Sequence, residues 1–282
     1  MKIATIKKLV LLYVFILSPL SDVFAYQVDT LKVYSEKMHK IVPNLIIKPA
    51  NYKNVAKKYP IVYLLHGYGA DYTTWNSVIK KDLPLLATKY QFIIVCPDGQ
   101  NSWYWDSPIN INSQYDTYIS KELVCAVDSL YQTIADVKGR AISGFSMGGH
   151  GALWLTIKHP NLFGACGSMS GGVDIRPFPK NWEMYKQLGN YLNNKSLWDS
   201  YTVVTQIGTL KKKDKAIIID CGESDFFIQV NNQLHQKMLD EGIKHLYSTS
   251  PGGHTPSYWR QSIDKHLQFF SDYFKFQSKS NK

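Results

Sequence analysis

The sequence predicts an α/β fold built on a mostly parallel sheet with helices on both faces. Short apolar runs alternate along the chain with longer segments whose apolar residues recur at helical spacing. This alternation is typical of strand–helix–strand units, whose strands are parallel and buried on both sides. No internal repeat or low-complexity linker divides the chain, so we expect one domain over residues 26–282.

Five apolar runs are expected to form buried strands of this sheet. In chain order they are IVYLL (61–65), FIIVC (92–96), RAISGF (140–145), ACGSMS (165–170) and AIIID (216–220). Residues 31–60 predict less regular antiparallel strands that lead into the sheet. Ligands of such sheets bind beyond the carboxyl ends of the strands, so catalytic residues should directly follow the apolar runs.

Three amphipathic segments predict helices over residues 116–133, 227–242 and 255–274. The second of them is expected to stop at Gly242. The positions expected on the buried faces are Ile119, Leu123, Val127 and Leu130 in the first, Val230, Leu234 and Met238 in the second, and Trp259, Ile263, Leu267, Phe270 and Phe274 in the third.

The first 25 residues have the layout of a secretory signal peptide. Three lysines precede an apolar run at 9–17, and Val23 and Ala25 stand at the −3 and −1 positions of a cleavage site. The apolar run is short for a membrane span. We therefore expect export to the periplasm or the medium, a mature chain that begins near Tyr26, and no stable membrane insertion after cleavage. An uncleaved N-terminal anchor is the alternative.

The composition is that of a folded protein, with 45% hydrophobic and 19% charged residues and a formal net charge of +10. A positive surplus can reflect nucleic-acid or anionic-surface binding. The one dense basic run, KKKDK at 211–215, is interpreted as a solvated loop, because no nucleic-acid-binding motif accompanies it. No nucleic-acid partner is expected.

Neither the cysteines nor the histidines suggest a metal or cofactor site. Cys96, Cys125, Cys166 and Cys221 form no C-x-x-C pair, and the histidines lack the spacing of metal ligands. Cys96 and Cys221 lie in strand-like runs, where free buried thiols are the usual outcome. Export would permit a disulfide, but no required one is expected.

Ser146 stands where a catalytic nucleophile is expected in such a fold. It lies in Gly144-Phe145-Ser146-Met147-Gly148, directly after one apolar run and before a helix-like segment. The glycines leave room for a tight turn, and the helix N-terminus favours developing negative charge. A serine hydroxyl needs a base to become nucleophilic, so partners are required. An ordinary Gly-rich connection is the alternative interpretation.

Two later segments supply those partners in the order acid, then histidine. Asp225 follows the strand AIIID by a few residues, and His254 follows a Gly-Gly turn in SPGGHTPSYW. The acid would hold the imidazole in one tautomer and stabilise its charged form. Glu223 is a rival to Asp225. Asp220, at the strand end itself, is expected to bond to the backbone or to a neighbouring loop instead.

The other histidines are weaker candidates for the base. His150 falls in the helix after Ser146, and His235 and His245 have helix or loop settings. His159 precedes a proline and is expected to end a helix. His254 alone has the strand-then-loop placement that lets an imidazole reach the serine.

A pocket for the developing oxyanion is expected from two backbone N–H groups. Met147, one residue after the nucleophile, supplies the first. The second is expected from Tyr68, in the loop His66-Gly67-Tyr68-Gly69 that follows the strand IVYLL. Gly67 and Gly69 would let this backbone approach a substrate closely. A plain Gly-containing turn is the alternative.

At these residues the chain resembles the esterase D branch of the α/β hydrolases. The motifs LLHGYGADYTTW, SGFSMGGHGAL, CGESDFF and GGHTPSYW carry the resemblance, which spans nearly all of residues 58–272. That branch includes S-formylglutathione hydrolases, secreted feruloyl and acetyl esterases, and mycolyltransferases. The resemblance implies the α/β-hydrolase fold, with Ser146 as nucleophile, Asp225 as acid, His254 as base, and Tyr68 and Met147 as oxyanion donors.

Secreted members of that branch often act on esters carried by polysaccharides, so the expected substrate is an acetyl or feruloyl ester on a plant polysaccharide, with other small esters as the alternative. Trp103, Tyr104 and Trp105 are expected on the substrate rim, and Trp182 and Tyr185 in a lid over the site. Loop packing is the alternative for each aromatic residue, and Asp106 is expected to hold its own loop.

Two other functions stay open on sequence alone. The same acyl-enzyme could pass its acyl group to an alcohol, as in the mycolyltransferases. The fold could also serve as a catalytically silent carbohydrate-binding module, against which the intact Ser, Asp and His set argues.

Overall fold

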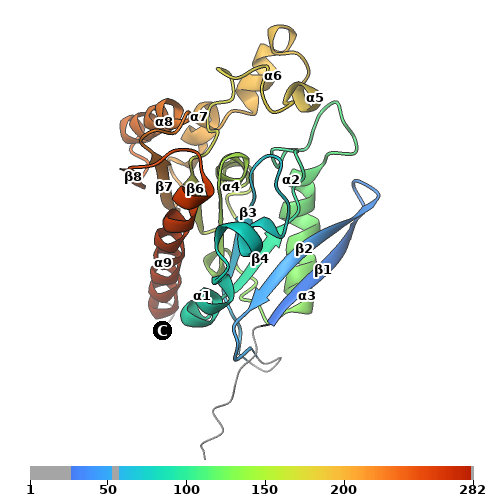
Figure 1. Ribbon diagram of the computed structural model, residues 1–282, viewed down its shortest axis with the longest axis vertical. Helices are drawn as coiled ribbons and strands as arrows, with labels where there is room; N and C mark the ends of the chain where they lie inside the picture. Colours follow the sequence, from blue (N-terminus) through green and yellow to red (C-terminus); the bar gives the residue numbers. More distant parts are fainter. Residues whose placement is uncertain (1–26, 53–56, 281–282) are drawn as a thin grey trace, which may run out of the picture.

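The computed structural model describes residues 27–52 and 57–280, and its centre is an eight-stranded sheet (Figure 1). The order of strands is β1-β2-β4-β3-β5-β6-β7-β8, and all pairs from β4 to β8 are parallel. The strands are β1 (Gln27–Ser35), β2 (Lys40–Lys48), β3 (Ile61–Leu65), β4 (Ile93–Pro97), β5 (Arg140–Gly144), β6 (Ala165–Met169), β7 (Ala216–Gly222) and β8 (Leu246–Ser250). The predicted α/β-hydrolase architecture is confirmed, and each of the five predicted strands coincides with an observed one to within two residues.

The N-terminal antiparallel strands are more regular than the sequence suggested. Strands β1 and β2, of nine residues each, form a hairpin in which Ser35 faces Lys40, and β2 also pairs antiparallel with β4. His39, in the connecting turn, has a φ of 52°. The hairpin therefore extends the parallel sheet at one edge.

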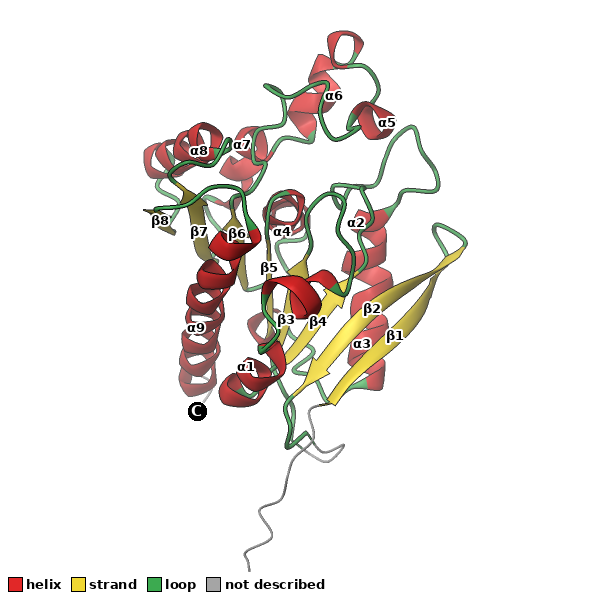
Figure 2. Ribbon diagram, viewed as in Figure 1, coloured by secondary structure: helices red, strands yellow, loops and turns green. Residues whose placement is uncertain are grey.

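Helices cover both faces of the sheet (Figure 2). On one face lie α1 (Leu83–Tyr90) and α9 (Pro256–Ser280), which contact each other. On the other lie α3 (Val124–Leu130), α4 (Met147–Lys158) and α8 (Ile228–Asp240). The short helices are α2 (Tyr115–Thr117), α5 (Tyr185–Leu188), α6 (Lys195–Ser200) and α7 (Val203–Gln206), with π-helical turns at Trp75–Ile79 and Tyr118–Leu123 and 3₁₀ turns at Val137–Gly139, Tyr191–Asn193 and Ile207–Leu210.

The predicted buried faces of α8 and α9 are confirmed. Every apolar position expected there is at most 9% exposed, from Val230 in α8 to Phe274 in α9. The helical segment that ends in α3 differs at one position, because Leu130 is 58% exposed. Leu130 is the last residue of α3, where the chain leaves the helix, and its side chain is exposed.

Three of the four cysteines are buried and all four are free, with Cys125 exposed. Burial raises the pKa of the thiols of Cys96, Cys166 and Cys221. The basic run at 211–215 lies in a mostly exposed loop, as expected. Over residues 27–52 and 57–280, no helix combines the length and the apolar character needed to cross a bilayer.

A buried hydrogen-bond chain ties α9 to the centre of the sheet. The His266 ring in α9 lies 2.8 Å from Ser143 Oγ of β5 through Nδ1 and 2.7 Å from Asp220 Oδ2 of β7 through Nε2. All three residues are at most 1% exposed. The ring passes over β6 at Gly167, where a Cβ atom would lie 2.3 Å from its Nδ1. Only glycine at this position lets one imidazole reach both neighbouring strands.

The sequence-based expectation for Asp220 is therefore wrong in its partners. Its carboxylate bonds to the side chains of His266 and Ser262, both of α9, and not to backbone or a loop. These two residues lie one helical turn apart, so one face of α9 is hydrogen-bonded to the end of β7. These hydrogen bonds fix the relative positions of β5, β7 and α9, and Ser146, Asp225 and His254 lie at the ends of these elements.

Replacing His266 by alanine is expected to lower the free energy of unfolding by about 3 kcal/mol. The change leaves the buried Asp220 carboxylate without its main partner, and breaking a buried pair carries a penalty of this order. Urea denaturation followed by circular dichroism measures it. The matched control is Gln268→Ala, an exposed position on the same helix whose loss should be about 0.5 kcal/mol or less. Equal stabilities of the two variants would show that the His266–Asp220 contact does not stabilise the fold.

Candidate active site

Ser146 occupies a strained turn between β5 and α4. Its φ of 57° and ψ of −119° are unusual for a residue with a side chain, and such strain persists only where the surroundings enforce it. Two glycines supply that enforcement. A Cβ on Gly148 would lie 2.3 Å from Leu65 O at the end of β3, and one on Gly144 would lie 2.4 Å from the Gly148 carbonyl. The backbones around Ser146 are thus in direct contact, and the turn cannot relax.

The three residues predicted as nucleophile, base and acid form one hydrogen-bonded chain. His254 Nε2 lies 2.9 Å from Ser146 Oγ, and His254 Nδ1 lies 2.8 Å from Asp225 Oδ2. A carboxylate only accepts hydrogen bonds, so Nδ1 carries the imidazole proton and Nε2 is free to accept from the serine hydroxyl. The structure thus brings together side chains from three loops at the carboxyl ends of the strands.

Asp225, and not Glu223, contacts the histidine. Its side chain is almost fully buried, and its second oxygen accepts a hydrogen bond from the Phe227 N–H at 2.8 Å. Glu223 is exposed, and its backbone N–H bonds to Ser250 O of β8. The reason is positional, because the turn that follows β7 directs residue 225 inward and residue 223 to solvent.

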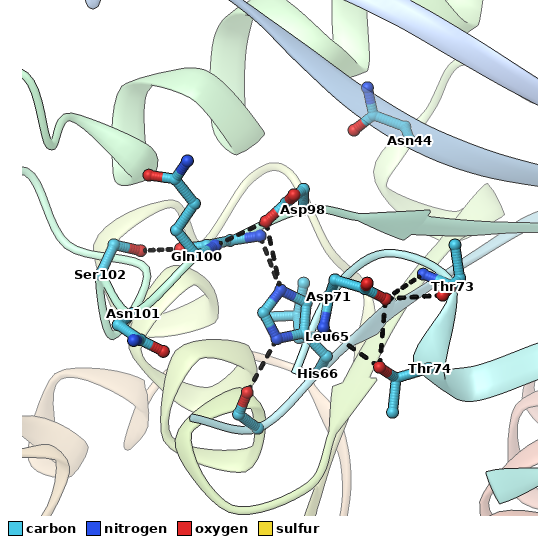
Figure 3. Close-up of polar contacts among 12 residues, drawn as sticks. Asn44, Leu65, His66, Asp71, Thr73, Thr74, Asp98, Gln100, Asn101 and Ser102 are labelled. Carbon is cyan, nitrogen blue, oxygen red and sulfur yellow. Dashed lines mark hydrogen bonds and ion pairs between the residues drawn. The ribbon is translucent and has the colours of Figure 1, made fainter. Parts of the chain in front are cut away.

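The loop after β3 lies against Ser146 and is anchored by His66. A Cβ on Gly67 would lie 3.3 Å from Ser146 Cβ. The buried His66 ring accepts a hydrogen bond from the Gly99 N–H at Nε2, so its Nδ1 donates to the Gly67 carbonyl, each at 2.8 Å (Figure 3). In a trans peptide the C=O and N–H point in opposite directions. Holding the Gly67 carbonyl therefore aims the Tyr68 N–H away from His66.

The two predicted oxyanion donors share one further property. Among the described residues, the backbone N–H groups of Tyr68 and Met147 donate no hydrogen bond to the protein. The neighbouring N–H groups are occupied, since Gly69 donates to Asn101 Oδ1 at 2.8 Å and Ser146 donates to Met169 O at 2.9 Å. Within residues 27–52 and 57–280, these two donors beside the serine thus have no protein acceptor.

A largely apolar cavity of about 280 Å³ opens over the serine. Phe226 covers the His254 ring with centroids 4.2 Å apart, and Trp182 stacks on Phe226 at 5.8 Å. The residues that line the cavity are Gly67, Tyr68, Gly69, Ala70, Thr74, Val78, Ile79, Phe145, Ser146, Trp182, Phe226, His254, Pro256 and Trp259. Trp182 is thus the one predicted tryptophan that faces the serine.

The expectation that Trp103 and Trp105 contact substrate is wrong. They are 1% and 0% exposed, and their rings stack on each other at 5.4 Å beneath the loop surface. Trp105 Nε1 donates to His150 Nε2, and the neighbouring Tyr104 is also fully buried. Burying large aromatic rings stabilises the fold more than exposing them at the rim, so this loop packs the two tryptophans inward. Asp106 holds the loop as expected, by accepting from Thr117.

Tyr185 and Trp182 both belong to the long connection between β6 and β7, which carries α5 to α7 above the sheet in Figure 1. Trp182 and Glu183 have φ values of 48° and 50°. Tyr68 Oη donates to Glu183 Oε2 at 3.3 Å, so this connection touches the loop after β3. Tyr185 is 48% exposed and lies outside the cavity over the serine.

Sequence reasoning missed three residues of the site. Phe226 was not singled out, although it directly follows Asp225. Trp259 was assigned to the buried face of α9, and it also reaches the cavity while stacking on Phe145 at 4.3 Å. His66 was read only as part of a glycine loop. The sequence signal that could have identified His66 was the glycine after it. Gly67 has no side chain, so the His66 ring can reach the Gly67 carbonyl.

Among the described residues, no group of three or more histidine, cysteine, aspartate or glutamate side chains could hold a metal ion. The groups that the site presents are the Ser146 hydroxyl, the His254 imidazole, the Asp225 carboxylate and the backbone N–H groups of Tyr68 and Met147.

Known proteins provide an independent comparison. The sequence model of the family described as "Putative esterase" matches residues 35–270. An acetyl esterase of Caldicellulosiruptor saccharolyticus is 26% identical, with 74% of this chain and 82% of that protein covered. An esterase of Mycobacterium tuberculosis is 27% identical over 78% of this chain, but the match spans 54% of that longer protein. A solved ferulic acid esterase superposes with a TM-score of 0.75 at 26% identity, covering 89% of this chain and 99% of its own.

His150, directly beneath the serine, is held neutral by its surroundings. Trp105 Nε1 can only donate, so His150 Nε2 accepts from it at 2.9 Å, and Nδ1 donates to Gly172 O at 2.9 Å. Burial lowers the pKa of His150 to about 4, and the Gly172 bond opposes this only in part. Gly172 in turn donates its N–H to Ser146 O, which connects His150 to the strained turn.

We expect stability to fall as the pH drops from about 6.5 to about 4. In this window the unfolded chain protonates His150 at its ordinary pKa of 6.5, whereas the folded chain does not until about 4. Between pH 6.5 and 4 the unfolded state binds more protons than the folded state. The contribution of His150 to the free energy of unfolding therefore decreases by about 3 kcal/mol over this range. Urea unfolding of the wild type and of His150→Gln at pH 7 and pH 4 measures this. The glutamine variant should lack this part of the loss, and parallel losses in both proteins would refute the assignment.

Proposed function

The chain belongs to the "Putative esterase" family and is a carboxylic ester hydrolase, and from this premise we propose that Ser146, His254 and Asp225 form its catalytic triad. The observation that carries the proposal is the continuous chain of hydrogen bonds from Asp225 through His254 to the hydroxyl of Ser146. Ser146 Oγ attacks the ester carbonyl and His254 Nε2 takes its proton. His254 returns that proton to the departing alcohol, which leaves an acyl group on Ser146.

In the second half of the reaction, water is the nucleophile and Ser146 is the leaving group. His254 removes a proton from a water molecule, the resulting hydroxide attacks the acyl-enzyme, and the acid leaves as Ser146 recovers its proton. In each step the carbonyl oxygen becomes negative, and the N–H groups of Tyr68 and Met147 stabilise it. These two donors are supported by their lack of a protein acceptor and by the anchoring of the Gly67 carbonyl on His66. Asp225 stabilises the imidazolium that forms in each half-reaction.

The substrate class proposed is an acetyl or feruloyl ester carried by a plant polysaccharide. The cavity of about 280 Å³ accommodates an acetyl group or one aromatic acyl group, and its Trp182 and Phe226 walls suit a planar ring. The similarity to an acetyl esterase and to a ferulic acid esterase supports the same two acyl groups. Turnover of acetylated xylan, methyl ferulate and short nitrophenyl esters by the wild type ranks these substrates.

Export is part of the proposal. It is supported by the signal-peptide pattern at 1–25, which lies outside the described residues. N-terminal sequencing of the protein recovered outside the cytoplasm should begin at or near Tyr26.

Replacing Ser146 by alanine is expected to lower kcat for nitrophenyl acetate on the order of 10⁶-fold, because the variant lacks the hydroxyl that forms the acyl-enzyme. Initial rates and labelling by an organophosphonate measure the effect. Ser168→Ala is the control, since Ser168 is a buried serine of the neighbouring strand whose hydroxyl has no partner among the described residues. Turnover or labelling of Ser146→Ala at the control's level would end the proposal.

Asp225→Asn is expected to lower kcat by about 10⁴-fold with little change in fold. The amide can donate to the imidazole, which favours the tautomer that cannot accept from Ser146. Glu223→Gln, two residues earlier and exposed, should keep wild-type kcat. Steady-state kinetics on one nitrophenyl ester decide between the two carboxylates. A larger loss of kcat in Glu223→Gln than in Asp225→Asn would show that Glu223, and not Asp225, is the acid.

A further inference from the structure

A second cavity, of about 400 Å³, lies near the catalytic one and is lined only by polar side chains. Its walls come from the start of β2, from the loops that follow β4, and from α2 and α5, all on the same side of the molecule in Figure 1. The lining residues are Lys40, Gln100, Asn101, Ser102, Asn110, Asn112, Ser113, Tyr115 and Gln187. We call this cavity the amide groove, after its five asparagine and glutamine side chains.

A hydrogen bond connects the amide groove to the catalytic cavity, although the two cavities are lined by different residues. Asn101 lines the groove, and its Oδ1 accepts a hydrogen bond from the Gly69 N–H at 2.8 Å. Gly69 lines the catalytic cavity, one residue after the proposed oxyanion donor Tyr68. This contact places the two cavities next to each other, and it is the geometric basis for assigning the alcohol portion of an ester to the groove when its carbonyl lies at Ser146.

The chemistry of the groove selects a polyhydroxyl ligand. Amide and hydroxyl side chains both donate and accept hydrogen bonds, as sugar hydroxyls do. No aliphatic side chain lines the groove, which disfavours a lipid, and no carboxylate lines it, which disfavours a cation. A groove of this volume is within the usual range for small-molecule sites.

Two buried polar atoms of the groove have no hydrogen-bond partner among the described residues. They are Tyr115 Oη and Gln187 Oε1, on side chains that are 1% and 9% exposed. Buried polar atoms are nearly always paired, and an unpaired one calls for a specific explanation. Two in one groove, beside a catalytic centre, are explained if a bound ligand supplies their partners after a small movement of these side chains.

Lys40 adds a mobile donor to the same groove. Its Nζ lies 4.9 Å from the centre of the Tyr115 ring and donates to Gln100 Oε1 and to Asn112 O. No carboxylate in the described part of the chain comes within ion-pair distance of this ammonium. Its present partners are neutral, so it can turn to a ligand oxygen without breaking an ion pair.

We propose that the amide groove is a sugar subsite, which holds one neutral pentose or hexose unit of the alcohol portion while the acyl group lies at Ser146. This inference rests on the proposed ester hydrolysis and specifies its substrate as an acylated oligosaccharide. The sugar hydroxyls would pair with Tyr115 Oη, Gln187 Oε1 and the Lys40 ammonium. The groove then discriminates between a saccharide ester and a small ester with the same acyl group.

The test compares acetylated xylotriose with nitrophenyl acetate in Tyr115→Phe and Gln187→Met. Tyr115→Phe removes the hydroxyl and Gln187→Met the amide whose buried oxygens have no partner in the described part of the chain, so the melting temperature should not fall. We expect KM for acetylated xylotriose to rise about fivefold or more in each variant, the effect of one lost hydrogen bond, with kcat/KM for nitrophenyl acetate unchanged. The matched control is Tyr63→Phe, because Tyr63 Oη is also buried and unpartnered but belongs to β3, away from the groove.

A binding measurement separates the sugar site from the reaction. Xylotriose without an acyl group should bind the Ser146→Ala protein in saturation-transfer NMR, and Tyr115→Phe in that background should weaken the signal. Unchanged kinetics for both esters in both groove variants, or no xylotriose binding, would overturn the sugar subsite while leaving ester hydrolysis intact. Absence of turnover of either ester by the wild type, with binding still dependent on Tyr115, would instead remove the proposed reaction and keep the site.

Discussion

The strained turn at Ser146 is the constraint on which the rest of the site depends. A residue with a side chain keeps a φ of 57° only if nothing around it can yield, and here the obstacle is backbone. The end of β3 lies so close to Gly148 that no side chain fits between them. The contact that enforces the turn also brings the loop after β3 beside the serine. The strain at Ser146 and the placement of two backbone N–H groups beside it thus follow from one close approach of two chain segments.

Buried histidines connect the elements around this turn. His66, His150 and His266 are each fully buried, and each places one ring nitrogen against a group from one segment and the other against a group from a second. An imidazole can donate on one side and accept on the other, so it links two segments with a single rigid ring. His66 anchors the loop after β3, His150 supports the helix after Ser146, and His266 ties α9 to β5 and β7. His254 uses the same two-sided bonding, but at the surface of a cavity, where its second nitrogen faces a hydroxyl that can react.

The two cavities give the site a division of labour. The one over Ser146 is aromatic and suits an acyl group, whereas the amide groove offers donors and acceptors for hydroxyls. Asn101 of the groove accepts a hydrogen bond from the Gly69 N–H, which connects the groove to the loop that carries the Tyr68 N–H. A ligand that fills the groove would contact the side chain that holds this loop in place. In the proposed complex, one amide side chain would thus contact both the sugar and the loop that carries the Tyr68 N–H.

The sequence by itself determined the order of strands and helices, the placement of Ser146 after β5 and of His254 before α9, and the buried faces of α8 and α9. These features are local, because apolar periodicity, glycine spacing and motif order are written in contiguous residues. Tertiary structure decided what depends on approach between distant segments. It placed Asp225 inward and Glu223 outward, gave Asp220 to His266, buried Trp103 and Trp105 against His150, and set Phe226 over His254. No pattern within a single segment encodes such choices, since each is settled by the space and the hydrogen-bond partners that another part of the chain leaves available.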